Sequence, residues 1–172
     1  MEKEKTIRQM IIAALVGGLL SGSLLSAVFG YVIRQDTIEM EQQIRWKEKV
    51  LSGLLGPVCM QLDRTERAFH RWKSKNLYLE AKIIKESNTV IRDLLLRNGH
   101  LIPIELLDDS GKLIEHYDVW LEEFEKRRGG KEPDVNTTFI YAGIAGYPFP
   151  KEAQEHYKKQ CNKYKTELFG DA

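Results

Sequence analysis

An uncharged apolar stretch near the N-terminus constrains the fold of this chain more than any other feature. Residues 10–33 contain no charged residue and no Pro, Asn or Gln, and Arg8 and Arg34 flank them. At about 1.5 Å per residue, a helix of this length reaches roughly 36 Å, which is enough to cross a hydrocarbon core of about 30 Å. The stretch is also longer than the apolar region of a typical signal peptide. We therefore expect a tail at residues 1–9 and a single transmembrane helix over residues 10–33.

Small residues recur at every fourth position of this apolar stretch. A stripe of this kind lets two helix backbones approach closely in a bilayer, where association depends on packing. Gly and Ala are also generally frequent in membrane helices, which is the simpler explanation. We expect a homo-oligomer assembled through the stripe. Its residues are Ala14, Gly18, Gly22, Ser26 and Gly30.

Charge and cysteine usage narrow the class of protein. Lys and Arg together number 26 and Asp and Glu 25, so the chain as a whole has no excess charge that would attract nucleic acid. Cys59 and Cys161 lie far apart and have no ligand-like spacing with a histidine, which argues against a disulfide framework and a zinc site. We expect two free thiols, no metal and no cofactor.

The side of the membrane is less sharply indicated, because basic residues both precede and follow the apolar stretch. Two free thiols and the lack of a secretory signature favour a cytoplasmic C-terminal domain. The expected localisation is therefore the cell inner membrane, with one pass through the lipid bilayer.

The remaining chain has the periodicity of helices. Residues 34–56 predict an amphipathic helix next to the membrane, and Gly56-Pro57 predicts a break or kink before a helical domain at 57–172. Further helices are expected from 58 to about 97, interrupted at Ser87-Asn88, then from 103 to 129 and from 150 to near 170. The sequence predicts an all-α fold: one transmembrane helix followed by a helical bundle, with one short strand or apolar loop near 137–147. The tryptophans expected in the core are Trp46, Trp72 and Trp120.

The common catalytic signatures are missing from the sequence. There is no GxxxxGK[ST] phosphate loop, no HExxH, no GxSxG at a strand-to-helix turn and no cluster of Cys and His. This absence argues against an ordinary enzyme.

One spacing nevertheless has catalytic potential. Arg64 and His70 are separated by five residues on a predicted helix. The pair resembles the Arg-x(4 to 6)-His motif of HEPN-type ribonucleases, although Thr65 departs from the commoner form of that motif. The resemblance implies metal-free RNA cleavage at a site shared by two protomers, with Arg64 stabilising phosphate charge and His70 transferring a proton. The simpler interpretation is a solvated helix face whose arginines pair with nearby acids.

The predicted architecture also resembles the small single-pass membrane accessory proteins found beside type VI-B CRISPR effectors and similar prokaryotic antiviral membrane effectors. The resemblance covers the short tail, the membrane helix, the helical cytosolic domain and the HEPN-like pair. It implies an oligomer that forms a pore or depolarises the membrane during antiviral defence.

Three functions therefore remain open from the sequence. The first is an oligomeric, non-enzymatic membrane effector or accessory protein. The alternatives are a membrane-tethered HEPN-like ribonuclease that acts on RNA, and a membrane-anchored scaffold that binds a cytosolic protein partner through residues 130–150.

Overall fold

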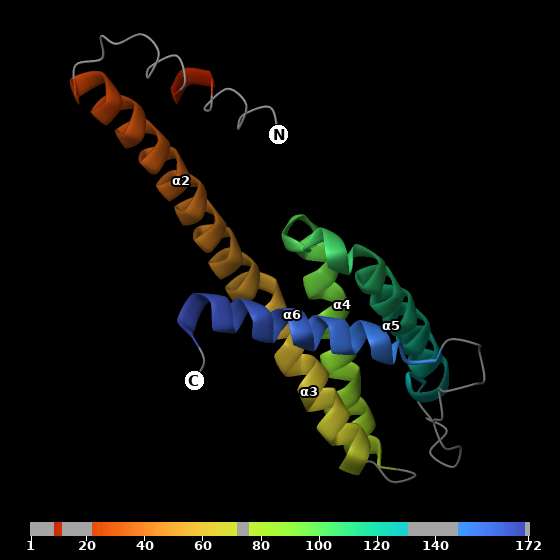
Figure 1. Ribbon diagram of the computed structural model, residues 1–172. Coiled ribbons are helices and arrows are strands. Elements are labelled where there is room, and N and C mark those ends of the chain that lie inside the picture. Colours follow the sequence, from red (N-terminus) through yellow and green to blue (C-terminus); the bar gives the residue numbers. More distant parts are fainter. Residues whose placement is uncertain (1–8, 12–21, 72–75, 131–147, 171–172) are drawn as a thin grey trace. The chain divides into compact units, whose positions relative to one another are not determined.

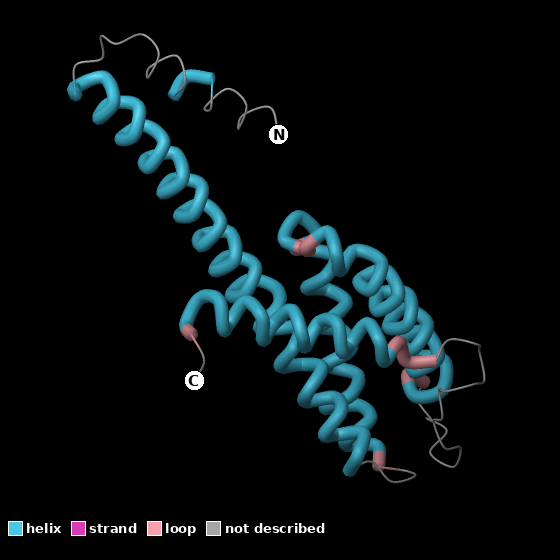
Figure 2. Tube along the Cα trace, in the orientation of Figure 1, coloured by secondary structure: helices cyan, strands magenta, loops and turns pink. Residues whose placement is uncertain are grey.

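The computed structural model describes residues 9–11, 22–71, 76–130 and 148–170, and its regular elements are all helical (Figure 1, Figure 2). The α-helices are α2 (Gly22–Val50), α3 (Gly56–Arg71), α4 (Lys85–Arg97), α5 (Leu107–Arg128) and α6 (Lys151–Phe169). Two π-helical turns, η1 (Leu51–Leu55) and η2 (Leu79–Ile84), and two 3-10 turns, η3 (Gly99–Leu101) and η4 (Ile104–Leu106), complete the described elements. The predicted helical bundle is confirmed. The strand or apolar loop predicted near 137–147 lies outside the described residues.

The predicted transmembrane helix over residues 10–33 is wrong, and so is the inner-membrane localisation that depended on it. None of the helices in the described part of the chain is both long enough and apolar enough to cross a membrane. The uncharged part of α2 ends at Ile33, so Gly22 to Ile33 supplies only 12 residues, about 18 Å of helix. Beyond Arg34 the same helix is rich in charged residues. Residues 12–21, in the first half of the predicted span, lie outside the described residues.

The chain divides after Arg45 into two compact units, Met1–Arg45 and Trp46–Ala172. In the first unit, α2 passes through the predicted boundary between residues 33 and 34 without a break. Its apolar side chains there are exposed, including Tyr31, Ile33 and Met40.

The second unit begins with a helical run that continues through a proline. Pro57 has no N–H, so an ordinary α-helix would lose one hydrogen bond at this position. The π-turn η1 precedes it, and the Gly56 N–H donates to the Leu51 carbonyl oxygen across that turn. A Cβ at Gly56 would lie 2.8 Å from the same oxygen, which explains a glycine here. The break or kink predicted at Gly56-Pro57 is therefore a widened turn, not an end.

Three helices of the second unit form an antiparallel meander, and a fourth lies across it. In Figure 1, α3, α4 and α5 run alternately down and up side by side, and α6 packs against α5, α3 and η1. The main apolar core lies among these elements. Its largest fully buried side chains include Leu54, Leu62, Ile91, Leu113, Tyr117 and Tyr157.

A smaller apolar cluster lies beside η2. It comprises Ala68, Ile84, Trp120 and Phe124, and the rings of Trp120 and Phe124 stack with centroids 5.3 Å apart. Trp120 thus occupies the core as predicted, whereas Trp46 is 42% exposed. Trp72 lies outside the described residues.

The helix predicted from residue 58 to about 97 differs from the structure in where it is interrupted. The interruption expected at Ser87-Asn88 is wrong, because both residues are buried within α4. The described residues of the long predicted helix form separate segments, α3 up to Arg71 and a helical segment after Asn76, whose side chain accepts a hydrogen bond from the Leu79 N–H. This contact is a typical N-terminal cap.

Candidate anion-binding site

Three arginines on one side of α3 stand beside a hollow in the second unit. Arg64, Arg67 and Arg71 are spaced by three and four residues, so their side chains leave the same side of the helix over about 10 Å of its length. They line a hollow of about 250 Å³. Its apolar lining comes from Ala68 of α3 and from Leu79 and Ile83 of η2. The surface of the hollow is therefore mostly apolar, and the three arginines line it chiefly with the carbon chains that carry their guanidinium groups.

Arg64 is held at this hollow by contacts to the following helical segment. Its guanidinium donates to the Ser87 hydroxyl at 3.3 Å and to the Lys82 carbonyl oxygen at 3.4 Å, and lies 3.8 Å from the Glu86 carboxylate. These are long contacts that keep the side chain oriented. At 39% side-chain exposure, the guanidinium remains accessible to a ligand.

The other two arginines are more exposed. Arg67 donates to the Asp63 carboxylate at 2.7 Å, and this hydrogen bond holds the pKa of Asp63 below its ordinary value. The Arg67 side chain is nevertheless 76% exposed, and exposed ion pairs of this kind are weak because water competes for both groups. Arg71, at the C-terminal end of α3, is also exposed. Both guanidinium groups can therefore turn toward an anionic ligand at little cost.

The charge of the surrounding segment also favours an anionic ligand at the hollow. Residues 64–85 contain seven lysines and arginines against two glutamates, whereas the whole chain is close to neutral at +1. One of those two glutamates, Glu80, is buried against Arg128, with oxygen–nitrogen distances of 3.0 and 3.4 Å. The segment around the hollow is thus basic, with Asp63 and Glu86, the acids that pair with Arg67 and Arg64, directly at its two ends. This signal was present in the sequence, but the near-neutral total charge concealed it.

Arg64 and His70, the predicted catalytic pair, leave α3 in different directions. Six positions along an α-helix correspond to about 120° of separation around its axis. His70 is exposed and does not line the hollow. It lies near Glu66, whose pKa is lowered chiefly by a hydrogen bond from Lys158 and further by His70. The described chain therefore does not bring Arg64 and His70 to one site, and a role for the pair in a shared site stays a prediction.

The predicted oligomerisation stripe is only partly described. Ala14 and Gly18 lie outside the described residues. Gly22 and Ser26 belong to α2, and Gly30 is exposed with open space where a Cβ would be. The homo-oligomer and the cytosolic protein partner stay predictions.

A second polar cluster joins α5 to α6. The His156 Nδ1 lies 2.8 Å from the Asp109 carboxylate, and the Tyr157 hydroxyl lies 2.6 Å from the Ser110 Oγ. Ser110 donates to the Leu106 carbonyl oxygen, so Tyr157 donates to Ser110. Burial raises the pKa of Tyr157 to about 12. Because the Ser110 hydroxyl is buried and engaged on both sides, we interpret this cluster as structural rather than nucleophilic.

The chain matches no family model, no curated protein and no solved structure. The functional interpretation therefore depends on the chemistry of its own residues.

Proposed function

We propose that this protein binds single-stranded nucleic acid at the arginine-lined hollow between α3 and η2. The observation that carries the proposal is the joint presence of Arg64, Arg67 and Arg71 around an apolar floor. Guanidinium groups bind phosphate oxygens through paired N–H donors and also stack on nucleobases. Binding to single strands combines these two features, a cationic track for the backbone and an apolar or planar surface for the bases.

The spacing suits a strand better than a lone anion. The three arginines extend over about 10 Å of helix, which exceeds what one phosphate group can contact. An isolated phosphate would also gain nothing from Leu79 and Ile83 on the floor. A strand laid along α3 would place several phosphates near the guanidinium groups and a base against the apolar side chains.

Binding without cleavage is the form of this function that the geometry favours. A general acid or base must lie within hydrogen-bond reach of the proton that it transfers. His70 is exposed and is not among the residues that line the hollow beside Arg64. We therefore expect the nucleic acid to remain intact in the complex.

Fluorescence anisotropy with a labelled oligouridylate of about 12 nucleotides tests the proposal. At low salt we expect saturable binding by the wild type and at least about tenfold weaker binding by Arg67→Gln/Arg71→Gln, because two phosphate contacts are lost. A deoxythymidylate of equal length shows whether the site distinguishes RNA from DNA.

The chain offers a matched control for one of these two substitutions. Arg97 on α4 is also exposed, at 79%, and also pairs with an aspartate four residues earlier, Asp93, at 3.6 Å. Arg97→Gln removes one charge away from the hollow and is matched to Arg67→Gln alone, so we expect near wild-type affinity for Arg97→Gln and weaker binding for Arg67→Gln. Equal weakening by both variants would mean that only the overall charge matters, and no binding at low salt would overturn the proposal.

Gel analysis of the same samples separates binding from cleavage. We expect intact RNA after prolonged incubation with the wild type. RNA cleavage that His70→Ala abolishes would contradict binding alone and would favour the ribonuclease hypothesis.

A further inference from the structure

The two cysteines meet between helices that are distant in sequence. Cys59 lies on α3 and Cys161 on α6, and these helices pack against each other. The Cys59 Sγ donates to the Tyr157 carbonyl oxygen at 3.4 Å. Tyr157 precedes Cys161 by one helical turn and shares its side of α6. The fold thus places the Cys59 thiol directly beside the turn that carries Cys161.

Both thiols are free, and their surroundings differ. Cys161 is 2% exposed in the main core, whereas Cys59 is half-buried at the edge of that core. A reagent from solution can therefore reach Cys59 but not Cys161. An accessible thiol beside a shielded one is the arrangement in which the first attacks and the second resolves.

The immediate contacts also favour a thiolate. Hydrogen bonding with Cys59 lowers the pKa of Cys161 to about 7, with a further contribution from Lys165. The pKa of Cys59 is raised, first by the same hydrogen bonding and then by burial and by the charge of Cys161. The thiolate is therefore favoured at Cys161, and a thiolate is the reactive species in disulfide exchange.

We propose that Cys59 and Cys161 are a modification site that closes to a disulfide when the folded protein meets a low-molecular-weight disulfide such as oxidised glutathione. The Cys59 sulfur attacks one glutathione sulfur and gives up its proton, so the glutathione S–S bond breaks and one glutathione thiol leaves with that proton. The Cys161 sulfur then attacks Cys59 in the mixed disulfide and displaces the second glutathione thiol. Two protein thiols are oxidised and one disulfide is reduced to two thiols, so atoms and electrons balance.

The disulfide would tie α6 to α3. The covalent loop would enclose about 100 residues, and closing a loop of this size restricts the unfolded chain strongly. We therefore expect the oxidised protein to melt at a higher temperature than the reduced protein. The melting temperature reports on this link independently of any nucleic-acid binding.

Intact mass spectrometry of the full chain tests the proposal. After incubation with oxidised glutathione, the folded wild type should lose about 2 Da, and digestion should join the peptides containing Cys59 and Cys161. Cys161→Ser should stop at a glutathione adduct on Cys59, and Cys59→Ser should react slowly, because its remaining thiol is buried.

The rate of disulfide closure in the folded chain is compared with the rate in the unfolded chain, which shows whether the fold promotes the reaction. The folded protein should close the disulfide faster than the same protein in urea, because the fold holds the two thiols together. Slower closure in the folded state, a persistent glutathione adduct on the wild type, or disulfide-linked dimers in place of the internal bond would overturn the proposal.

Discussion

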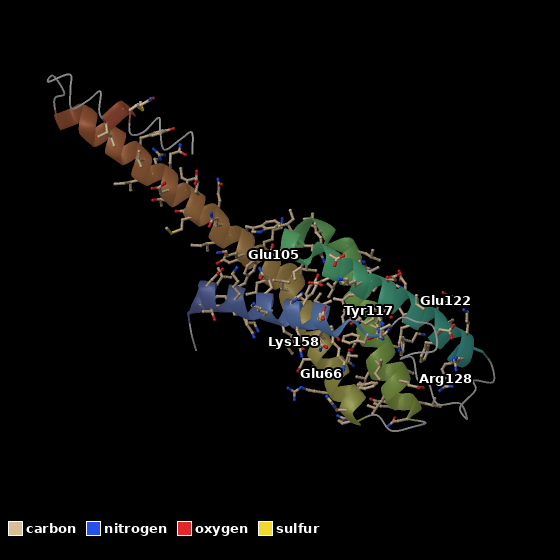
Figure 3. All side chains as sticks on the ribbon, turned by 45° about the vertical axis from the view of Figure 1, so that its right-hand side comes forward. Glu66, Glu105, Tyr117, Glu122, Arg128 and Lys158 are labelled. Atoms are coloured by element: carbon tan, nitrogen blue, oxygen red, sulfur yellow. The ribbon has the colours of Figure 1, made fainter. Side chains whose placement is uncertain are left out.

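Two arginines that contact η2, Arg128 and Arg64, differ in how fully the chain satisfies their charge. Arg128 is nearly buried, with its side chain 4% exposed, and two of its nitrogens donate to the Glu80 carboxylate. Figure 3 labels Arg128 at the end of α5. The Arg64 guanidinium, by contrast, makes three long contacts and remains accessible to solvent. The first arginine stabilises the fold, whereas the second leaves binding capacity for a ligand.

The difference follows from the cost of moving a charge out of water. A buried ion pair needs close, well-oriented partners, and removing one partner leaves an uncompensated charge in the interior. An exposed arginine keeps most of its hydration and loses little when a weak partner is exchanged for a phosphate. Arg128 therefore serves to stabilise the fold, whereas the arginines of the hollow remain available to bind a phosphate.

Removing the buried partner should have the largest effect. Glu80→Ala leaves the Arg128 guanidinium buried opposite a small apolar side chain, so we expect a loss of about 3–5 kcal/mol in the free energy of unfolding. Urea denaturation followed by circular dichroism measures it. Glu125→Ala is the matched control, because Glu125 also pairs across helices, with Lys85 at 3.5 Å, but is 65% exposed. If Glu80→Ala lost no more free energy of unfolding than Glu125→Ala, the buried and the exposed ion pairs would not differ in their contribution to stability.

Breaking the buried hydroxyl pair should have an intermediate effect. Ser110→Ala leaves the Tyr157 hydroxyl buried without its acceptor, so we expect a loss of about 1–3 kcal/mol in the free energy of unfolding. Ser110→Ala/Tyr157→Phe removes both polar groups, and it should be more stable than Ser110→Ala alone. A double variant that is no more stable than the single one would mean that the pair is less tightly enclosed than its burial indicates.

Freeing an arginine of the hollow should have the smallest effect. It should strengthen nucleic-acid binding, whereas the two preceding substitutions weaken the fold. Asp63→Asn removes the carboxylate that competes with a phosphate for Arg67, so we expect about two- to threefold tighter oligouridylate binding at low salt. Asp93→Asn, which frees Arg97 in the same way, is the control and should leave the affinity unchanged. Weaker binding by Asp63→Asn would show that Asp63 orients Arg67 for the ligand instead of competing with it.

Local helix signals predicted much of the second unit. Pro150 and Gly170 bracket α6, and Gly129 directly follows α5, as the sequence indicated. These signals work because proline and glycine act on the backbone at their own positions. At Gly56-Pro57 the sequence indicated a break or kink, and there one wide π-turn accommodates the missing N–H without ending the helical run.

The apolar N-terminal stretch shows that hydropathy alone does not predict a helix boundary. Hydropathy alone predicted a membrane helix that would end at Ile33, but α2 continues from its uncharged part into a charged one without a boundary. A stretch of apolar residues indicates which side chains avoid water, not where a helix ends. The helix boundary depends on backbone signals that are missing at residue 33.

The candidate site could be predicted only in part. Arg64 was identified through its spacing from His70, whereas its partners at the hollow are Arg67 and Arg71. A period of three to four residues was the relevant signal, and the count of local charge would have supported it. The proximity of Cys59 and Cys161 could not be predicted, because it depends on how α6 crosses α3.

The salt dependence of oligouridylate binding is the most direct test of nucleic-acid binding at the hollow. If three guanidinium groups contact three phosphates of a single strand, the logarithm of the association constant should fall against the logarithm of salt concentration with a slope of about −2. For Arg67→Gln/Arg71→Gln the slope should shrink to about −0.7, while Arg97→Gln keeps the wild-type slope. Identical slopes for the wild type and Arg67→Gln/Arg71→Gln would contradict the claim that the hollow binds the strand.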